Sequence, residues 1–213
     1  MKEITFTLTA CGRPDLLERT MDSFLKFNTY PIKRYKIVDD SAVVGVNDAL
    51  IEKYKSLGIE WKHNTARTGQ TESIDEMYSD IDTEYIFHCE DDWQFTEYGF
   101  IEKSIPVLEA NPNIILVGLR AHNDTNGQPI EYYNEEFDLM SLNFNGIWHG
   151  FTFNPGLRRL ADYLLVKPYK SIGWENDLSI KYKELGFRAA ILKEKHVEHI
   201  GWNRHIQDAT HFS

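Results

Sequence analysis

The spacing of hydrophobic residues predicts four strands in the first hundred residues. They are Ile4–Thr9, Tyr35–Val38, Ile59–Lys62 and Tyr85–Cys89. The fourth is apolar on both faces, which is typical of a buried strand in a parallel sheet. Apolar residues between the strands recur with a helical period over Pro14–Phe27, over Val46–Leu57 and around Ile74–Tyr78. Strands and helices therefore alternate along this half of the chain.

This alternation, with its short connections, predicts a mostly parallel sheet flanked by helices, so the expected fold class is α/β. In such sheets a ligand binds beyond the carboxyl ends of the strands. The polar residues found at or just after these ends are Thr9, Asp39, Asp40, Arg67, Glu90, Asp91 and Asp92. Their shared position indicates a binding site more strongly than any one of them does alone.

The second half of the chain is less regular. Its predicted elements are a helix from Phe100 to about Asn111, a strand at Ile114–Leu119, a strand at Ile147–Phe153, a helix at Pro155–Leu165, a helix around Leu178–Leu185 and a strand at Arg188–Leu192. Asn126-Gly127 suggests a hairpin turn, with weak pairing of Ile130–Tyr133 and Asp138–Leu142.

Length and charge narrow the class of protein. The chain has 213 residues, which fits one large domain. Its net charge of −10 argues against a nucleic-acid partner, because such partners require a basic surface. We find no signal peptide and no apolar run that would make a transmembrane segment. With only two cysteines, Cys11 and Cys89, we expect reduced thiols and a cytoplasmic location.

Missing motifs exclude further classes. The first strand is not followed by G-x-G-x-x-G, and the chain has no G-x-x-x-x-G-K-[ST]. A dinucleotide oxidoreductase and a P-loop nucleotide hydrolase are therefore disfavoured. The G-x-S-x-G turn of a serine hydrolase is also missing.

Three consecutive acids, Glu90, Asp91 and Asp92, follow the Tyr85 strand. Buried carboxylates repel one another and lose solvation unless a cation or several hydrogen-bond donors offset the charge. In extended backbone, Glu90 and Asp92 point the same way and Asp91 points opposite. A divalent cation that also holds a phosphate suits such a pair. On these residues alone, a charged and solvated loop is an equally good interpretation.

Six short motifs, in this order and spacing, resemble family 2 glycosyltransferases of the GT-A fold. Those of the first half are Thr9-Ala10-Cys11-Gly12-Arg13-Pro14, Val38-Asp39-Asp40-Ser41 and Cys89-Glu90-Asp91-Asp92. The motifs that resemble the acceptor-binding half of that family are Gly173-Trp174-Glu175-Asn176-Asp177-Leu178, Gly186-Phe187-Arg188 and Val197-Glu198-His199. The resemblance implies one GT-A domain over residues 1–213, in which 1–120 bind the nucleotide sugar and 121–213 bind the acceptor. It also implies a small soluble enzyme.

The resemblance implies a nucleotide-sugar donor, often UDP-linked, and a Mn²⁺ or Mg²⁺ ion. The residues expected around the donor are Thr9, Arg13, Asp39, Asp40, Arg67, Gln70 and Asp91. Thr9 and Asp40 would contact the nucleobase, although turn capping explains them as well. Arg67 would bind the diphosphate or stack on the base, although an ordinary surface arginine is an equal alternative.

The expected metal ligand is Asp92, joined by His199 and by Glu90, which stands where the family commonly has Asp. A hydrogen-bonded structural role is the commoner one for a lone histidine. Counting back from Leu178, Glu175 takes the place of the family's catalytic carboxylate, and Asp177 is the rival base. A first-turn acid that serves the helix dipole is the plain alternative for Glu175. Trp148 and Trp174 are expected near the acceptor.

Together these residues imply a metal-dependent, inverting glycosyltransferase in which Glu175 removes the proton from a hydroxyl of a glycan or another acceptor. A GT-A-like module that binds a nucleotide or glycan without turnover is one alternative. A sugar nucleotidyltransferase is a weaker one, because its glycine-rich, basic loop is missing after the first strand. The sequence leaves the oligomeric state open.

Overall fold

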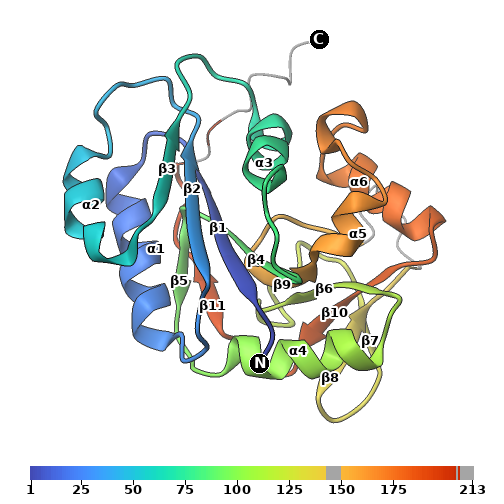
Figure 1. Cartoon of the computed structure of the whole chain (residues 1–213). Coiled ribbons are helices and arrows are strands. Elements are labelled where there is room, and N and C mark those ends of the chain that lie inside the picture. The colour runs from blue at the N-terminus through green and yellow to red at the C-terminus, as the bar shows by residue number, and fades with distance from the viewer. Residues whose placement is uncertain (143–149, 205, 207–213) are drawn as a thin grey trace.

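A central sheet organises the computed structural model, which describes residues 1–142, 150–204 and 206. The described strands of this sheet lie in the order β3-β2-β1-β4-β9-β6-β10-β8-β7 (Figure 1). Their bounds are β1 Ile4–Ala10, β2 Arg34–Asp39, β3 Glu60–His63, β4 Tyr85–Glu90, β6 Ile114–Gly118, β7 Ile130–Tyr132, β8 Phe137–Met140, β9 Gly156–Arg159 and β10 Arg188–Leu192. Strands β9, β8 and β7 pair antiparallel with their neighbours, and the remaining pairings are parallel. The predicted α/β class with a mostly parallel sheet is confirmed.

Strand β1 lies between β2 and β4, so the strands that start at Ile4 and Tyr85 are neighbours. This register places Thr9 opposite Glu90 and Ala10 opposite Asp39. The polar residues that follow these three strands therefore meet at one edge of the sheet. Cys11 and Cys89 lie near the same edge, and both are free thiols.

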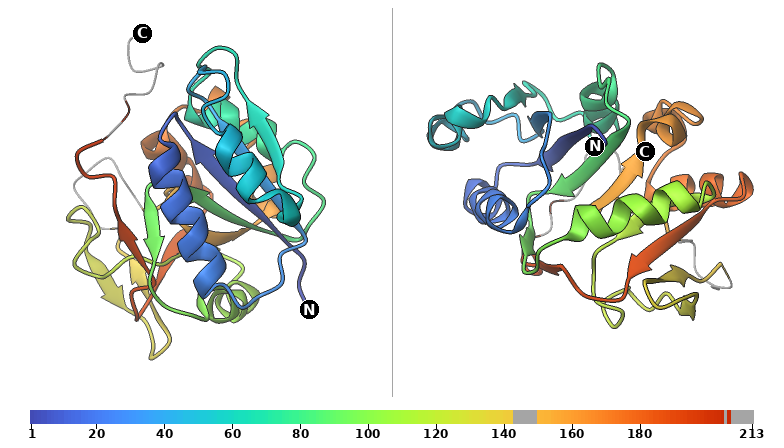
Figure 2. Two further views of the ribbon diagram at one scale, coloured as in Figure 1. Left: turned by 90° about the vertical axis from the view of Figure 1, so that its left-hand side faces the viewer. Right: turned by 60° about the horizontal axis from the view of Figure 1, so that its bottom comes forward.

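Helices cover both faces of the sheet (Figure 2). Helices α1 (Pro14–Phe27) and α4 (Phe100–Ala110) pack on one face, where Phe24 and Phe100 meet Phe87 of β4. Helices α3 (Gln70–Tyr78), α5 (Leu160–Leu164) and α6 (Glu175–Glu184) pack on the other, with a short 3₁₀ turn at Tyr169–Ser171. The central strands β1, β4 and β6 are buried on both faces, and this explains the nearly continuous apolar runs of β4 and β6.

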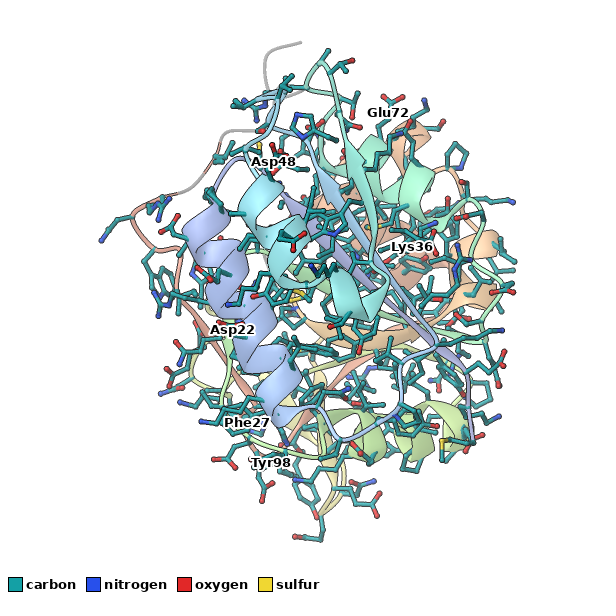
Figure 3. All side chains as sticks on the ribbon, turned by 60° about the vertical axis from the view of Figure 1, so that its left-hand side comes forward. Asp22, Phe27, Lys36, Asp48, Glu72 and Tyr98 are labelled. Carbon is teal, nitrogen blue, oxygen red and sulfur yellow. The ribbon has the colours of Figure 1, made fainter. Side chains whose placement is uncertain are left out.

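The helix predicted over Val46–Leu57 is shorter than expected. Helix α2 covers Asp48–Lys53, and a 3₁₀ turn follows at Lys55–Leu57. Figure 3 shows α1, with Asp22 labelled, beside α2. Asp22 accepts hydrogen bonds from Lys53 Nζ at 2.7 Å and from Tyr54 Oη at 2.8 Å. These contacts with α1 stabilise α2, although it has fewer than two turns.

The helix predicted at Pro155–Leu165 is wrong over its first half. Gly156–Arg159 forms strand β9, which pairs antiparallel with both β4 and β6, and only Leu160–Leu164 is helical. A Cβ at Gly156 would come within 2.7 Å of the carbonyl oxygen of Val117. Glycine therefore permits the close approach by which β9 fits between β4 and β6.

The predicted pairing of Ile130–Tyr133 with Asp138–Leu142 is confirmed as that of β7 with β8, whereas the predicted position of the turn and the strand predicted at 147–153 differ. Asn126 and Gly127 have positive φ, as their turn chemistry requires, but they precede the hairpin. The β7–β8 connection is instead 133–136, where Asn134 Oδ1 accepts from Glu136 N at 2.8 Å. Of the strand predicted at 147–153, the described residues 150–153 are not a strand, and the remainder, including Trp148, lies outside the described residues.

A second, two-stranded sheet joins the C-terminal part to the acidic stretch. Strand β5 (Trp93–Phe95) pairs antiparallel with β11 (Val197–His199), and His199 stands opposite Trp93. Neither strand could be predicted from the sequence, because segments of three residues carry no clear period. In the part of the chain that the structure describes, no helix has the length and apolar character needed to cross a membrane.

Candidate functional site

A cavity of about 180 Å³ opens at the carboxyl ends of β1, β2 and β4. Its lining consists mainly of the polar residues that the sequence singled out. The lining residues are Thr9, Ala10, Cys11, Arg13, Asp40, Arg67, Gln70, Ser73, Glu90, Asp91, Asp92 and Ile206. The structure therefore brings the predicted donor-binding residues together, with Asp39 as the exception.

Asp39 lies behind the cavity and holds the surrounding turns. It is 1% exposed, and its carboxylate accepts hydrogen bonds from the backbone N–H groups of Gly12 at 3.0 Å and Ser41 at 2.9 Å. Asn47 Nδ2 donates to it as well, at 3.0 Å. Burial would raise the pKa of Asp39, but these hydrogen bonds outweigh the burial and lower it. Asp39 therefore fixes the β1–α1 turn.

Asp40 lines the cavity and anchors the loop before α3. Its Oδ1 accepts from Asn64 Nδ2 at 2.8 Å, from the backbone of Thr68 at 2.8 Å and from Thr68 Oγ1 at 3.1 Å. Its Oδ2 accepts from Gly69 N at 2.9 Å. A carboxylate has about four acceptor sites, two on each oxygen. Oδ2 is therefore the oxygen with capacity left for a donor group of a ligand.

Arg13 forms the electrostatic centre of the site. Its Nη2 and Nε donate to the two oxygens of Asp91, the latter at 3.2 Å, and its Nη1 lies 3.0 Å from Asp92 Oδ2. Burial raises the pKa of Asp91 to about 6, although Arg13 opposes the shift. The charge of one guanidinium thus offsets the charges of two adjacent carboxylates. Without it, burying both carboxylates at the edge of the sheet would carry a large desolvation penalty.

Asp92 also meets His199. His199 Nε2 lies 3.3 Å from Asp92 Oδ2, and the imidazole ring lies between the rings of Trp93 at 4.9 Å and Trp202 at 4.6 Å, measured between centroids. Burial would raise the pKa of Asp92, but the hydrogen bond from His199 and the charge of Arg13 lower it. A Cβ at Gly201 would lie 2.4 Å from Asp92 Oδ2, so the chain passes directly over this carboxylate.

Glu90 has different neighbours from Asp92. Gln70 Nε2 donates to its Oε1 at 2.8 Å, and Trp93 Nε1 donates to its Oε2 at 3.2 Å. With its amide oriented to satisfy both neighbours, Asn154 donates to Glu90 Oε2 at 3.2 Å and accepts from Arg120 Nη1 at 2.9 Å. Burial, and then the charges of Asp92 and Glu175, raise the pKa of Glu90 to about 8.

Glu175 and Asp177, the two candidate bases, point in different directions at the start of α6. Glu175 Oε1 accepts from the backbone N–H of Phe153 and from Thr152 Oγ1, the latter at 2.8 Å. Burial raises the pKa of Glu175 against the effect of these hydrogen bonds. Asp177 is exposed and accepts from the backbone N–H of Trp174 at 3.0 Å. Asp177 thus caps the helix locally, while Glu175 reaches inward to a distant segment.

The C-terminal segment completes the cavity, and the sequence analysis did not foresee this. Ile206 lines the cavity, and Arg13 Nη1 donates to the carbonyl oxygen of Arg204 at 2.9 Å. Arg204 Nη2 donates to Asp15 Oδ1 of α1 at 3.0 Å. A pair 189 residues apart leaves no local pattern, so only the fold reveals it.

The described residues fit a divalent ion in one limited way. No group of three or more His, Cys, Asp or Glu side chains among them is arranged to hold a metal. Asp92 and His199 do converge, and a carboxylate and an imidazole are both metal ligands. Mg²⁺-type sites commonly combine one or two carboxylates with phosphate oxygens of the substrate. The pair therefore fits an ion whose coordination a bound diphosphate completes.

Comparisons with known proteins identify the fold. No protein-family model matches the chain, and no curated protein sequence does. Among solved structures, S. aureus TarS 1–349 is similar with a TM-score of 0.66 at 13% identity, over 92% of this chain and 59% of that chain. The same TarS fragment in complex with UDP-GlcNAc matches with a TM-score of 0.67 at 13% identity, over 96% of this chain and 62% of that one.

The mannosyltransferase PcManGT from Pyrobaculum calidifontis, in complex with GDP-Man and Mn²⁺, matches with a TM-score of 0.66 at 14% identity. The match covers 89% of this chain and 56% of that one. This chain thus spans less than two thirds of the length of either protein. The shared architecture confirms the GT-A fold that the sequence motifs predicted.

Proposed function

We propose that this chain is a metal-dependent, inverting glycosyltransferase that uses a nucleotide-diphosphate sugar, with UDP as the favoured nucleotide. The observation that carries the proposal is the edge of the sheet where Asp91, Asp92 and Arg13 line one cavity. Glu175 is close enough to this edge for its charge to raise the pKa of Glu90. A cavity suited to a donor and a carboxylate suited to the role of base are therefore near each other, which supports the proposal. Residues 1–120 would bind the donor, and 121–213 the acceptor.

The donor would lie along the carboxyl ends of the strands. Thr9 and the open side of Asp40 Oδ2 are suited to the nucleobase, and Arg67, which is exposed at the cavity, is suited to the diphosphate. Asp91, held by Arg13 and by the backbone N–H of Cys11 at 3.3 Å, is suited to the ribose. Asp92 and His199 would hold the Mn²⁺ or Mg²⁺ ion. When bound, that ion supplies positive charge for the diphosphate leaving group.

The chemical step follows from the position of Glu175. Its described hydrogen bonds all reach Oε1, so Oε2 is left to accept the proton of the acceptor hydroxyl. The acceptor oxygen then forms a bond to the anomeric carbon with its freed electron pair. The bond from that carbon to the diphosphate breaks, and the diphosphate leaves with the bonding electrons. One displacement of this kind inverts the anomeric centre without a covalent enzyme intermediate.

Calorimetry of nucleotide binding tests the donor site. UDP and GDP are titrated into the wild-type chain and into Asp92→Asn, each with Mn²⁺ and with EDTA. We expect Mn²⁺ to tighten the binding of at least one of these nucleotides to the wild type by about 10-fold or more, and we expect Asp92→Asn to abolish this gain because it removes one of two protein ligands.

Asp124→Asn is the matched control, because Asp124 pairs with Arg120 and does not line the cavity. This variant should keep the full Mn²⁺ effect. Equal Mn²⁺-dependent affinity in the wild type and in Asp92→Asn would refute the metal assignment. A wild-type chain that binds neither nucleotide would refute the proposed function.

A further inference from the structure

Arg158 of β9 is a buried cation without a carboxylate partner. It is 1% exposed, and within the described part of the chain it forms no ion pair. Its Nε and Nη1 have no hydrogen-bond partner among the described residues. Its guanidinium carbon lies 5.4 Å from the ring centre of Phe151 and 6.0 Å from that of Phe153. An unpaired buried charge costs several kcal/mol, so its environment must offset much of this.

A short relay joins Arg158 to Glu175. Arg158 Nη2 donates to the carbonyl oxygen of Thr152 at 3.1 Å. The hydroxyl of the same threonine donates to Glu175 Oε1 at 2.8 Å, and the next backbone N–H, that of Phe153, donates to the same oxygen. The two ends of this relay come from β9 and from the start of α6 (Figure 1).

We propose that Arg158 is the positioning residue for the base: it holds the Thr152–Phe153 segment against Glu175 and supplies the buried positive charge that keeps this carboxylate ionised. The inference rests on the proposed function, in which Glu175 accepts a proton. Arg158 does not touch the substrate, because Thr152 lies between it and the base.

The charges around Glu175 come from several elements. Glu90 at the end of β4 opposes its ionisation, while Arg158 of β9 and Arg120, which follows β6, favour it. Asp177 on the same helix is turned to the backbone N–H of Trp174. Arg120 already pairs with Asp124 at 2.6 Å. Of these two arginines, Arg158 is therefore the one that forms no ion pair with a described carboxylate.

The test reads the protonation of Glu175 directly. The protein is labelled with ¹³C at the glutamate carboxyl carbons, and the resonance of Glu175 is assigned from its loss in Glu175→Gln. Three variants are titrated beside the wild type: Arg158→Gln, Arg158→Lys and Arg159→Gln. Gln keeps an N–H donor for Thr152 without the charge, and Lys keeps the charge. Arg159, the neighbour on β9, pairs with Asp162 at 2.9 Å and serves as the matched control.

We expect Arg158→Gln to raise the titration midpoint of Glu175 by at least about one pH unit, which corresponds to a tenfold change in ionisation. Arg158→Lys should recover most of this shift, and Arg159→Gln should leave the midpoint unchanged. Turnover by Arg158→Gln should fall at pH 6.5 and recover at higher pH, with the KM for the donor unchanged.

An unchanged midpoint in Arg158→Gln, or an equal shift in Arg158→Lys, would overturn the inference. Arg158→Met provides a second neutral variant where Arg158→Gln does not fold. The resonance is read without nucleotide or acceptor. A shift in a chain that transfers no sugar would therefore contradict the proposed function alone, whereas an unchanged midpoint in an active enzyme would contradict this inference alone.

Discussion

The two sides of the site treat their buried charges in opposite ways. On the donor side, Arg13 bonds directly to both acids. Its Nε lies 3.2 Å from Asp91 Oδ2, and its Nη1 lies 3.0 Å from Asp92 Oδ2. On the acceptor side, Arg158 reaches Glu175 only through Thr152, and the buried Arg158 guanidinium packs beside the rings of Phe151 and Phe153. The donor side is thus a closed ion cluster, while the acceptor side keeps a carboxylate oxygen open.

The difference suggests what each side is suited to do. Asp92 has a lowered pKa in spite of its burial, because His199 and Arg13 hold it, so it keeps its charge and geometry, which suits the binding of an ion and a diphosphate. A carboxylate held at one oxygen only, with burial raising its pKa, is suited to exchange a proton.

Arg13→Met should have the largest effect on stability. It leaves Asp91 and Asp92 as adjacent buried carboxylates without their cation, and removing one partner of a buried pair typically costs about 3 kcal/mol or more. Urea unfolding at pH 7.5 without added metal measures this loss. Arg204→Met, which removes an exposed pair with Asp15, should leave the unfolding free energy unchanged. Equal stability of the two variants would show that the Arg13 cluster contributes no more than a surface pair.

Glu175→Gln should have the largest effect on turnover. It keeps the shape of the side chain and removes its basicity, so turnover should fall by about 100-fold or more while nucleotide affinity stays within about 2-fold. Release of nucleoside diphosphate from a panel of UDP- and GDP-linked sugars measures the first effect, and calorimetry measures the second. A variant that retains near-native turnover would remove Glu175 from the role of base.

Glu90→Gln should stabilise the protein at high pH. Because burial raises the pKa of Glu90 to about 8, the folded state favours the protonated acid. The stability that this proton confers is complete below the unfolded pKa, near 4.5, and is lost as the pH rises to about 8. At about 1.4 kcal/mol per pH unit, we expect the wild type to lose up to about 5 kcal/mol across this window and Glu90→Gln to lose much less. Parallel pH profiles for the two proteins would contradict this account of Glu90.

Asp177→Asn should have the smallest effect. Asp177 is exposed and accepts only the N–H of Trp174 within the described contacts, so its role resembles that of a helix cap. We expect a loss of about 0.5 kcal/mol in unfolding free energy and turnover within about 3-fold of the wild type. If this variant is inactive and Glu175→Gln is active, the two acids have been assigned in the wrong order.

Local patterns in the sequence predicted the donor side well. Strand β1 alternates apolar residues with Thr, and β4 is largely apolar. Both lead into polar residues, and a parallel winding places those ends together. The acids at Asp40, Asp91 and Asp92 could therefore be placed on one edge before their contacts were known. The role of Arg13 as the cation shared by Asp91 and Asp92 could not be predicted, because Arg13 and Asp91 lie 78 residues apart.

The acceptor side was predicted less well for physical reasons. Strand β9 was taken for a helix because Pro155 can start one, whereas the approach of Gly156 to Val117 depends on a distant strand. Arg158 and Arg159 alternate on β9, which buries Arg158 and leaves Arg159 partly exposed, and no local pattern distinguishes the two arginines. Trp174 precedes α6 as expected, and its contact with an acceptor stays a prediction.

A crystal structure of the chain with UDP and Mn²⁺, with the anomalous signal of Mn²⁺ recorded, tests the central claim most directly. We predict one anomalous peak in contact with Asp92 Oδ2 and His199 Nε2, with the diphosphate beside it in the cavity and Glu175 facing the position of the sugar. A Mn²⁺ peak away from Asp92, or UDP bound outside this cavity, would contradict the account.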